Sequence, residues 1–156
     1  MKRERAAVRC PIERSVGQIG DSWTFMILRD AMYGMHRFTD FKNHIGIATN
    51  VLSARLSSMV DDGILEIREG TAGNSHEYHL TQKGRDLHVV LAALRQWGQK
   101  YLFEDGEMMN CAVDSATGEP PAELRLTSKD GRLLGVDDLD IVVTKVGSDH
   151  REPFQS

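Results

Sequence analysis

Residues 49–80 read TNVLSARLSSMVDDGILEIREGTAGNSHEYHL, and their hydrophobic period changes at Gly63. Before Gly63 the apolar residues recur at intervals of three and four, which predicts an amphipathic helix over residues 49–62. After it, apolar and polar residues alternate in two short runs, 65–68 and 77–80, joined by a glycine-rich segment. This alternation predicts a β-hairpin with one buried face, so the stretch is a helix followed directly by a hairpin.

The outer face of the predicted helix carries small polar side chains where a surface helix usually carries Lys and Glu. Short donors and acceptors let a helix backbone approach base edges in the major groove, which is about 12 Å wide. An asparagine such as Asn50 can pair bidentately with adenine. A face that only meets solvent is the alternative. The predicted base-contacting stripe consists of Thr49, Asn50, Ser53, Ala54 and Ser57.

Three more helices are predicted upstream, each ending at a glycine. The first starts at Pro11, a residue suited to the first helical turn, and ends at Gly20. The second is broadly apolar and therefore buried, with Asp21 or Ser22 as its cap, and Thr39 caps a short third helix. Helices followed by strand, turn and strand form the order of a winged helix-turn-helix domain. The predicted fold class is therefore mainly α with a small β wing (α+β).

Downstream of the hairpin, Thr81 is expected to cap a long helix over residues 82–103. Its wide apolar stripe is long for a small domain and needs another surface to cover it. A second copy of the chain is the simplest source of that surface. The stripe consists of Leu87, Val90, Leu91, Leu94, Trp97 and Tyr101.

The net charge of −4 is unevenly distributed along the chain. Residues 1–106 hold 14 basic and 13 acidic side chains, whereas residues 107–156 hold 5 and 10. The predicted parts are a basic N-terminal arm (1–9), a winged-helix and dimerisation domain (10–106), an acidic β-rich extension (107–146) and a flexible tail (147–156). The strands predicted for the extension are 109–113, 122–127 and 139–146.

Composition excludes several classes of protein. A chain of 156 residues with 40% hydrophobic and 27% charged residues is typical of one globular domain, with or without an appendage. No apolar run is long enough to span a membrane, and residues 1–9 are charged, unlike a secretory signal. These features and two lone cysteines predict a cytoplasmic protein. Six scattered histidines, and no nucleophile–base pair, predict no metal site, no cofactor and no enzymatic activity.

Several short motifs, in the same order, carry a resemblance to the HxlR family, which comprises bacterial winged-helix regulators related to the MarR group. The resemblance covers residues 10–106. The motifs are CPIE (10–13), GDSWTFMIL (20–28), RFTDF (37–41), LSARL (52–56), DGIL (62–65), EYHLTQKG (77–84) and WG (97–98).

The resemblance implies a homodimeric transcription factor, most often a repressor, that binds an inverted repeat in double-stranded DNA. The N-terminal helix and the long C-terminal helix would form the dimer, and two recognition helices would then enter successive major grooves on one face of the DNA. The side chains expected in the dimer are Ile12, Val16, Leu87, Leu91, Leu94, Trp97 and Tyr101.

The side chains expected near the DNA backbone are Arg37, Lys42, Arg55, Arg68 and His76. For Arg55, an ion pair with Asp40 or Asp62 is the alternative, and for Lys42 a purely solvated position. Family members usually carry Pro and Arg near the wing tip, but this chain has GTAGNSH over residues 70–76. Only Arg68 and His76 can supply charge there, so we expect a weak or salt-sensitive wing contact.

Cys10 occupies the position of the family's sensing cysteine, directly before the first helix. A thiol beside a helix N-terminus, with Arg9 and Arg14 nearby, is expected to react as a thiolate with electrophiles or oxidants. An adduct or an intersubunit disulfide would then shift the dimer and release DNA. The alternative is a small buried hydrophobe next to Pro11. Cys111 either packs in the extension or resolves an oxidised Cys10.

The sequence thus predicts a dimeric, sequence-specific transcriptional regulator that responds through Cys10 to a small electrophile or oxidant. Two alternatives stay open. One is a regulator whose small-molecule effector sits near the dimer helices, with no role for the cysteine. The other is a protein-interaction module without DNA binding.

Overall fold

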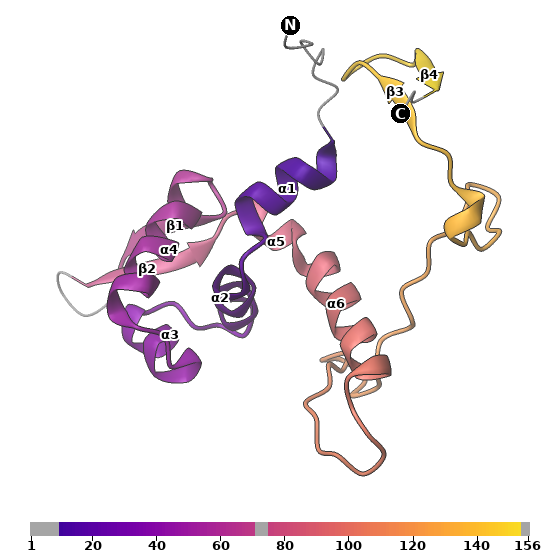
Figure 1. Ribbon diagram of the computed structural model, residues 1–156. Coiled ribbons are helices and arrows are strands. Elements are labelled where there is room, and N and C mark those ends of the chain that lie inside the picture. The colour runs from indigo at the N-terminus through magenta and orange to yellow at the C-terminus, as the bar shows by residue number, and fades with distance from the viewer. Residues whose placement is uncertain (1–9, 71–74, 154–156) are drawn as a thin grey trace, which may run out of the picture. The chain divides into compact units, whose positions relative to one another are not determined.

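Helix α2 (Ser22–Met32) is central to the computed structural model, which describes residues 10–70 and 75–153. It contacts α3, α4, β2 and α6 (Figure 1). The predicted mainly α fold with a small β wing is confirmed. The elements of residues 11–101, in chain order, are α1 (Pro11–Ile19), α2, α3 (Phe38–Ile45), α4 (Thr49–Asp61), β1 (Leu65–Glu69), β2 (His76–Leu80), α5 (Gln82–Asp86) and α6 (His88–Tyr101).

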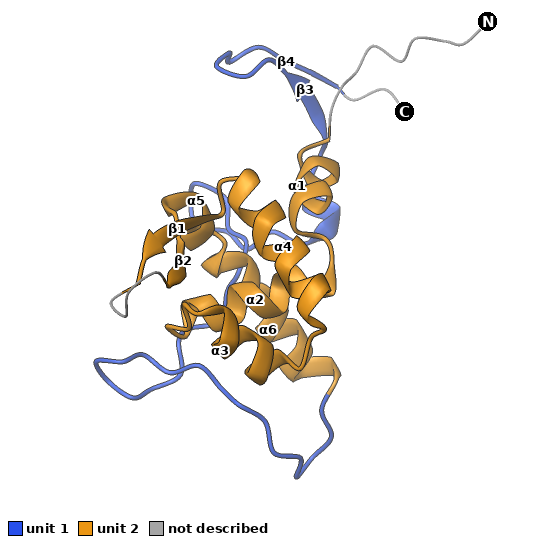
Figure 2. Cartoon of the chain, turned by 90° about the vertical axis from the view of Figure 1, so that its left-hand side faces the viewer, with its two compact units in different colours: residues 1–8, 103–156 blue, residues 9–102 orange. Residues whose placement is uncertain are grey.

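The chain divides into two units (Figure 2). One unit is residues 9–102, the winged-helix unit, and the other is residues 1–8 with 103–156. The described part of the second unit, residues 103–153, is called the extension from here on. It includes the extension predicted at 107–146 and part of the tail predicted at 147–156. Among the described residues, no helix has the length and apolar character needed to cross a membrane.

Local chemistry fixes several helix ends in the winged-helix unit. Asp21 and Thr81 cap α2 and α5 as predicted, because each side chain accepts hydrogen bonds from backbone amides of the first turn. Gly46 ends α3 and Gly63 follows α4, at φ of 71° and 68°. These left-handed conformations favour glycine and let the chain turn sharply out of each helix.

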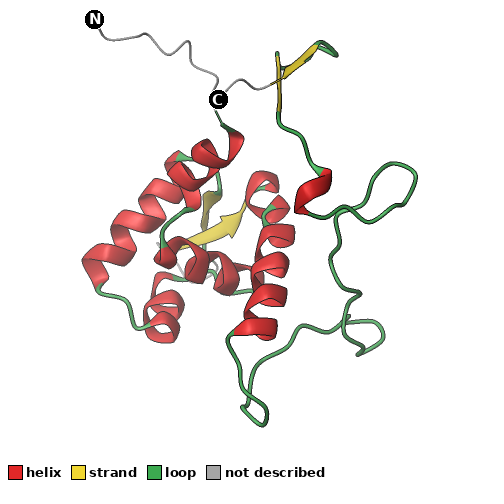
Figure 3. Cartoon of the chain, turned by 45° about the vertical axis from the view of Figure 1, so that its right-hand side comes forward, coloured by secondary structure: helices red, strands yellow, loops and turns green. Residues whose placement is uncertain are grey.

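The core of the winged-helix unit lies between α2, α3, α4 and the hairpin, with the helices gathered around the strands (Figure 3). Each large side chain buried there stabilises the fold by about 1.5–3 kcal/mol. Because α4 buries its apolar side, the opposite side of that helix is left to solvent. The largest fully buried apolar side chains are Phe41, Ile27, Leu28, Leu52, Leu56, Met59, Ile64 and Leu65.

Strands β1 and β2 pair antiparallel as the predicted wing, with Leu65 opposite Leu80 and Ile67 opposite Tyr78. All four side chains belong to the predicted inner face. Leu65 and Leu80 are buried at the base of the hairpin, whereas Ile67 is 50% exposed farther out. Most of the predicted flexible turn, residues 71–74, lies outside the described residues.

A short extended segment before α3 adds to the wing. The backbone of Arg37 forms an isolated antiparallel β-bridge with that of Glu77. The Tyr78 amide donates a hydrogen bond of 2.7 Å to the carbonyl oxygen of His36. This pairing holds Arg37 in an extended conformation as the residue that precedes α3. The predicted cap at Thr39 is therefore wrong, because the helix has already begun at residue 38.

The single long helix predicted for residues 82–103 is divided into α5 and α6 at Leu87. The Leu87 amide bonds to the carbonyl oxygen of Gly84, three residues back, at 3.2 Å, which tightens the chain locally. Gly84 also packs closely on the wing, since a Cβ there would lie 2.3 Å from the carbonyl oxygen of Ile64. The close packing of α5 and the tight turn set the direction in which α6 leaves the hairpin.

The extension contains much less strand than predicted. Strand β3 (Val142–Thr144) covers only part of the strand predicted at 139–146. It pairs antiparallel with β4 (Arg151–Pro153), which lies in the predicted flexible tail. The strand predicted at 109–113 is wrong, because these residues form no strand.

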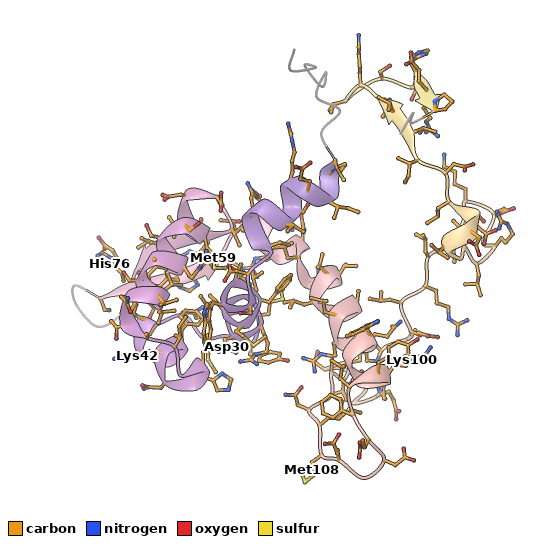
Figure 4. The ribbon with its side chains drawn as sticks, in the orientation of Figure 1. Asp30, Lys42, Met59, His76, Lys100 and Met108 are labelled. Atoms are coloured by element: carbon orange, nitrogen blue, oxygen red, sulfur yellow. The ribbon has the colours of Figure 1, made fainter. Side chains whose placement is uncertain are left out.

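The strand predicted at 122–127 is also wrong, because it is reduced to one bridge between Thr127 and Leu133. No described residue of the extension is buried, and Met108 is 97% exposed (Figure 4). A run of β-type residues needs a partner strand and a core to pack on. Without them, most of the extension consists of loops and turns.

Candidate nucleic-acid interface

The predicted polar stripe lies on the exposed side of α4. Because Leu52, Leu56 and Met59 on the opposite side are buried, the orientation of the helix is fixed by the core. No side chain caps the N-terminus of α4, where Ala48 precedes the helix. Each predicted base-contacting residue is exposed: Thr49, Asn50, Ser53, Ala54 and Ser57.

A buried carboxylate attaches α3, the helix before the stripe, to α2. Asp30 is fully buried, and its Oδ1 lies 2.8 Å from Nε of Arg29. Its Oδ2 lies 2.7 Å from Nδ1 of His44 on α3 (Figure 4). The sequence reasoning missed this cluster, although a lone Asp in an apolar helix was a signal for it. The cluster fixes α3, and through it the start of α4.

Arg55 holds α4 to the start of α2. Its Nη1 lies 3.4 Å from Oδ2 of Asp21, so an ion pair exists but not with the expected partners Asp40 or Asp62. Burial raises the pKa of Asp21, but hydrogen bonds from Thr24 and the charge of Arg55 outweigh it, so the pKa is lowered overall. The side chain of Arg55 is 42% exposed, so its guanidinium is also accessible from solvent.

The basic side chains of the wing are paired with carboxylates. Arg68 Nη2 lies 2.5 Å from Oε1 of Glu66, and Arg37 Nε lies 3.5 Å from Oε1 of Glu77. The wing therefore offers little unpaired positive charge, in agreement with its composition. Lys42 on α3 and His76 on β2 are exposed, and both are marked on the α3 and wing side of the unit in Figure 4.

Cys10 is exposed and directly precedes α1. The alternative interpretation, that Cys10 is a small buried hydrophobic residue beside Pro11, is therefore wrong. Cys111, in the extension, is exposed as well, so it is not packed as expected. Both thiols are accessible to reagents in solution.

Large apolar side chains of α1 and of α6 are exposed in the winged-helix unit. Ile12 and Val16 on α1 are 73% and 58% exposed, and Leu94, Trp97 and Tyr101 on α6 are 46%, 55% and 59% exposed. We call these five residues the helical apolar surface. Of the remaining residues predicted for the dimer, Leu87 and Leu91 are half-buried and pack against the core of their own unit.

The fold and the exposed face of α4 define a winged helix-turn-helix protein. The chain belongs to the HxlR-like helix-turn-helix family, whose pattern matches residues 18–106. The resemblance inferred from the motifs is thereby confirmed.

Known proteins similar to the chain share this fold. Rv3095 of Mycobacterium tuberculosis, an uncharacterised HTH-type transcriptional regulator, is 37% identical over 92 residues, which are 58% of this chain and 58% of the relative. The chain thus spans little more than half of that relative. The crystal structure of PA1607, described as a candidate transcription factor, is 37% identical with a TM-score of 0.83, covering 86% of this chain and 94% of that one.

The redox regulator HypR in its reduced form is also similar. It is 26% identical with a TM-score of 0.54, and the match covers 58% of this chain and 92% of HypR. The three similar proteins are thus described as a transcriptional regulator, a candidate transcription factor and a redox regulator.

Proposed function

We propose that the protein is a sequence-specific DNA-binding transcriptional regulator that acts as a repressor. The observation that carries the proposal is the exposed stripe of small polar side chains on α4, whose opposite side is locked into the core. A rigid helix with short donors and acceptors is suited to reading base edges. Family membership and the regulator relatives support the same function.

Replacing Asn50 by alanine is expected to lower affinity for the operator by at least about 30-fold, because each of the two half-sites loses one bidentate base contact. Non-specific affinity is expected to change little, because it depends on phosphate contacts. Fluorescence anisotropy with operator and mixed-sequence duplexes measures both.

Ser58→Ala is the matched control, since Ser58 is exposed on α4 but lies at the edge of the stripe. Operator binding by Asn50→Ala with full sequence preference would refute the assignment of α4 as the reading helix.

We propose that the functional unit is a homodimer built on the helical apolar surface. Monomeric proteins rarely leave such a set of large apolar side chains uncovered, and a two-fold axis lets one surface cover itself. Two α4 helices about 34–36 Å apart would enter successive major grooves. Because the two helices are related by a two-fold axis, the operator is expected to be an inverted repeat.

We also propose that Cys10 senses an electrophile. The exposed thiol and the likeness to HypR support this assignment. The thiolate would add to the electrophile, forming a carbon–sulfur bond while the adduct takes up a proton from water. The modified side chain then lies directly before α1, two residues before Ile12 of the proposed dimer surface.

Cys10→Ser is expected to abolish release of operator DNA by a quinone-type electrophile. Wild-type protein is expected to lose at least about tenfold in affinity on treatment, a usual size for coupling between two sites. Cys111→Ser serves as the control, and footprinting with and without the reagent gives the readout. An unchanged response in Cys10→Ser would eliminate the sensing proposal.

A second candidate is regulation by a small molecule bound between α2 and α5–α6. An open cavity of about 340 Å³ lies there, lined by Ala31, Met32, Leu80, Arg85 and His88. Its volume is at the small end for ligand sites. Under this alternative, the effector response persists in Cys10→Ser and is lost when Met32→Trp fills the cavity.

A further inference from the structure

Two histidines stack where the segment before α3 meets the wing. The ring centroids of His36 and His79 are 4.1 Å apart, with an angle of 23° between the rings. His79 Nε2 lies 3.1 Å from Oε2 of Glu77, and the other oxygen of that carboxylate, Oε1, lies 3.5 Å from Nε of Arg37. One carboxylate is therefore shared between a histidine and an arginine that is a candidate for phosphate contact.

The two histidines are not equivalent as proton acceptors. His36 Nδ1 is buried and has no hydrogen-bond partner among the described residues. In an imidazolium both nitrogens are donors, so charging His36 would bury a donor without an acceptor. His79 already faces a carboxylate through Nε2, and a charge on one ring disfavours a charge on the ring stacked on it. A proton taken up by the pair is therefore placed on His79.

Protonation of His79 changes the competition for Glu77. The hydrogen bond from His79 lowers the pKa of Glu77, burial opposes it, and the bond and charge of Arg37 lower it further, so the carboxylate stays ionised. A neutral His79 gives Glu77 one hydrogen bond, and Arg37 supplies the only formal positive charge among its described partners. A charged His79 supplies a second positive charge next to Glu77, so the carboxylate depends less on Arg37. The side chain of Arg37 is 53% exposed and is then freer to pair with a phosphate.

The other charged groups around the pair leave this competition in place. On β1, Glu66 and Arg68 stand opposite His79 and Glu77, but they pair with each other. On α2 and α3, which also contact β2, Arg29, Asp30 and His44 form their own cluster. On α5, which contacts β2 as well, Lys83 donates to the Asp62 carbonyl oxygen and Asp86 accepts from Gln82. Arg85 on α5 is exposed. Asp40 and Lys42 on α3 are exposed to solvent.

We propose that Glu77 and His79 are positioning residues for Arg37, holding its guanidinium in the free protein and releasing it to a DNA phosphate when His79 binds a proton. The proposal rests on the proposed DNA-binding function and goes beyond it by coupling wing protonation to affinity. Binding of DNA then takes up protons, and by reciprocity affinity rises as the pH falls.

The test measures affinity for a mixed-sequence duplex of about 30 base pairs at constant salt, from about pH 8 to about pH 6. Wild-type protein is expected to bind roughly tenfold more tightly at the lower pH. Glu77→Gln is expected to bind at pH 8 as wild-type protein does at pH 6, with little pH dependence. Adding Arg37→Ala to Glu77→Gln is expected to remove that gain.

His79→Gln separates titration from structure, because glutamine can still donate to Glu77 but cannot take up a proton. It is expected to bind with little pH dependence. The matched control is His150→Gln, since His150 forms the same kind of pair with Glu152, at 3.0 Å, in the extension. This control is expected to keep the wild-type pH profile.

Two failures are distinguishable. If wild-type protein binds DNA but His79→Gln keeps the full pH dependence, or Glu77→Gln binds no more tightly at pH 8, the inference is overturned and the proposed function stands. If neither wild-type protein nor Glu77→Gln binds any duplex at low salt, the proposed function fails and the inference with it.

Discussion

Trp97→Glu is expected to convert the proposed dimer to monomers and to lower operator affinity by at least ~100-fold. Trp97 is 55% exposed on α6, and its ring lies 5.6 Å from that of Tyr101, so it is a large apolar side chain on the surface of the winged-helix unit. In a two-fold interface, one substitution places two carboxylates in apolar surroundings. A monomer binds only one half-site, so it loses the gain in affinity from binding two half-sites together, which is commonly a factor of about 10²–10⁴.

Sedimentation velocity and operator binding, measured on the same samples, test this prediction. Trp97→Phe keeps an apolar ring and is expected to stay dimeric. Leu94→Glu, one turn away on α6, is expected to reproduce the loss. A Trp97→Glu protein that remains dimeric and binds the operator normally would place the dimer interface elsewhere.

Asp30→Ala is expected to lower the free energy of unfolding by about 3 kcal/mol or more. Asp30 is fully buried, and its two oxygens bind side chains from two helices. Its removal leaves a cavity and takes the carboxylate partner from Arg29 and His44, so the polar link between α2 and α3 is lost. The fall in stability is measured by urea denaturation with full-length protein.

Asp40→Ala is the control for a carboxylate on α3, because Asp40 is exposed and its loss is expected to change stability by less than about 0.5 kcal/mol. Asp30→Asn keeps the side-chain volume and removes the charge, so its free energy of unfolding is expected to lie between those of Asp30→Ala and Asp40→Ala. Equal stability of Asp30→Ala and Asp40→Ala would show that the cluster does not hold α3.

The sequence predicts the elements whose signals are local. The period change at Gly63 separates α4 from the wing correctly, and the caps at Asp21 and Thr81 follow from side-chain chemistry next to each helix. The polar stripe on α4 is exposed for the same reason, since the helical period alone decides which side of α4 is buried. These features depend on neighbours a few residues away.

Contacts between distant elements could not be predicted in the same way. Asp30 meets His44 across 14 positions, and Arg55 finds Asp21 instead of the acidic residues nearer in sequence. Each pair depends on how two helices cross, which periodicity does not define. The same reason accounts for the paired state of Arg37, which follows from its isolated β-bridge to Glu77 in the wing.

In the extension, local signals predict more strand than the structure contains. Its β-type runs predict three strands, yet only residues 142–144 of those runs form one, with a partner in the predicted tail. β-propensity describes a side chain that fits a packed, half-buried surface. Since no described residue of the extension is buried, the extension does not form such a surface from its own described residues.

Selection of binding sites from random duplex DNA tests the central claim most directly, that two α4 helices of a dimer read an inverted repeat. Wild-type protein is expected to enrich an inverted repeat with half-site centres about 10–10.5 base pairs apart. Asn50→Ala, selected in parallel, is expected to lose or relax that preference. Failure of wild-type protein to enrich any sequence, or enrichment of the same site by Asn50→Ala with equal strength, would contradict the claim.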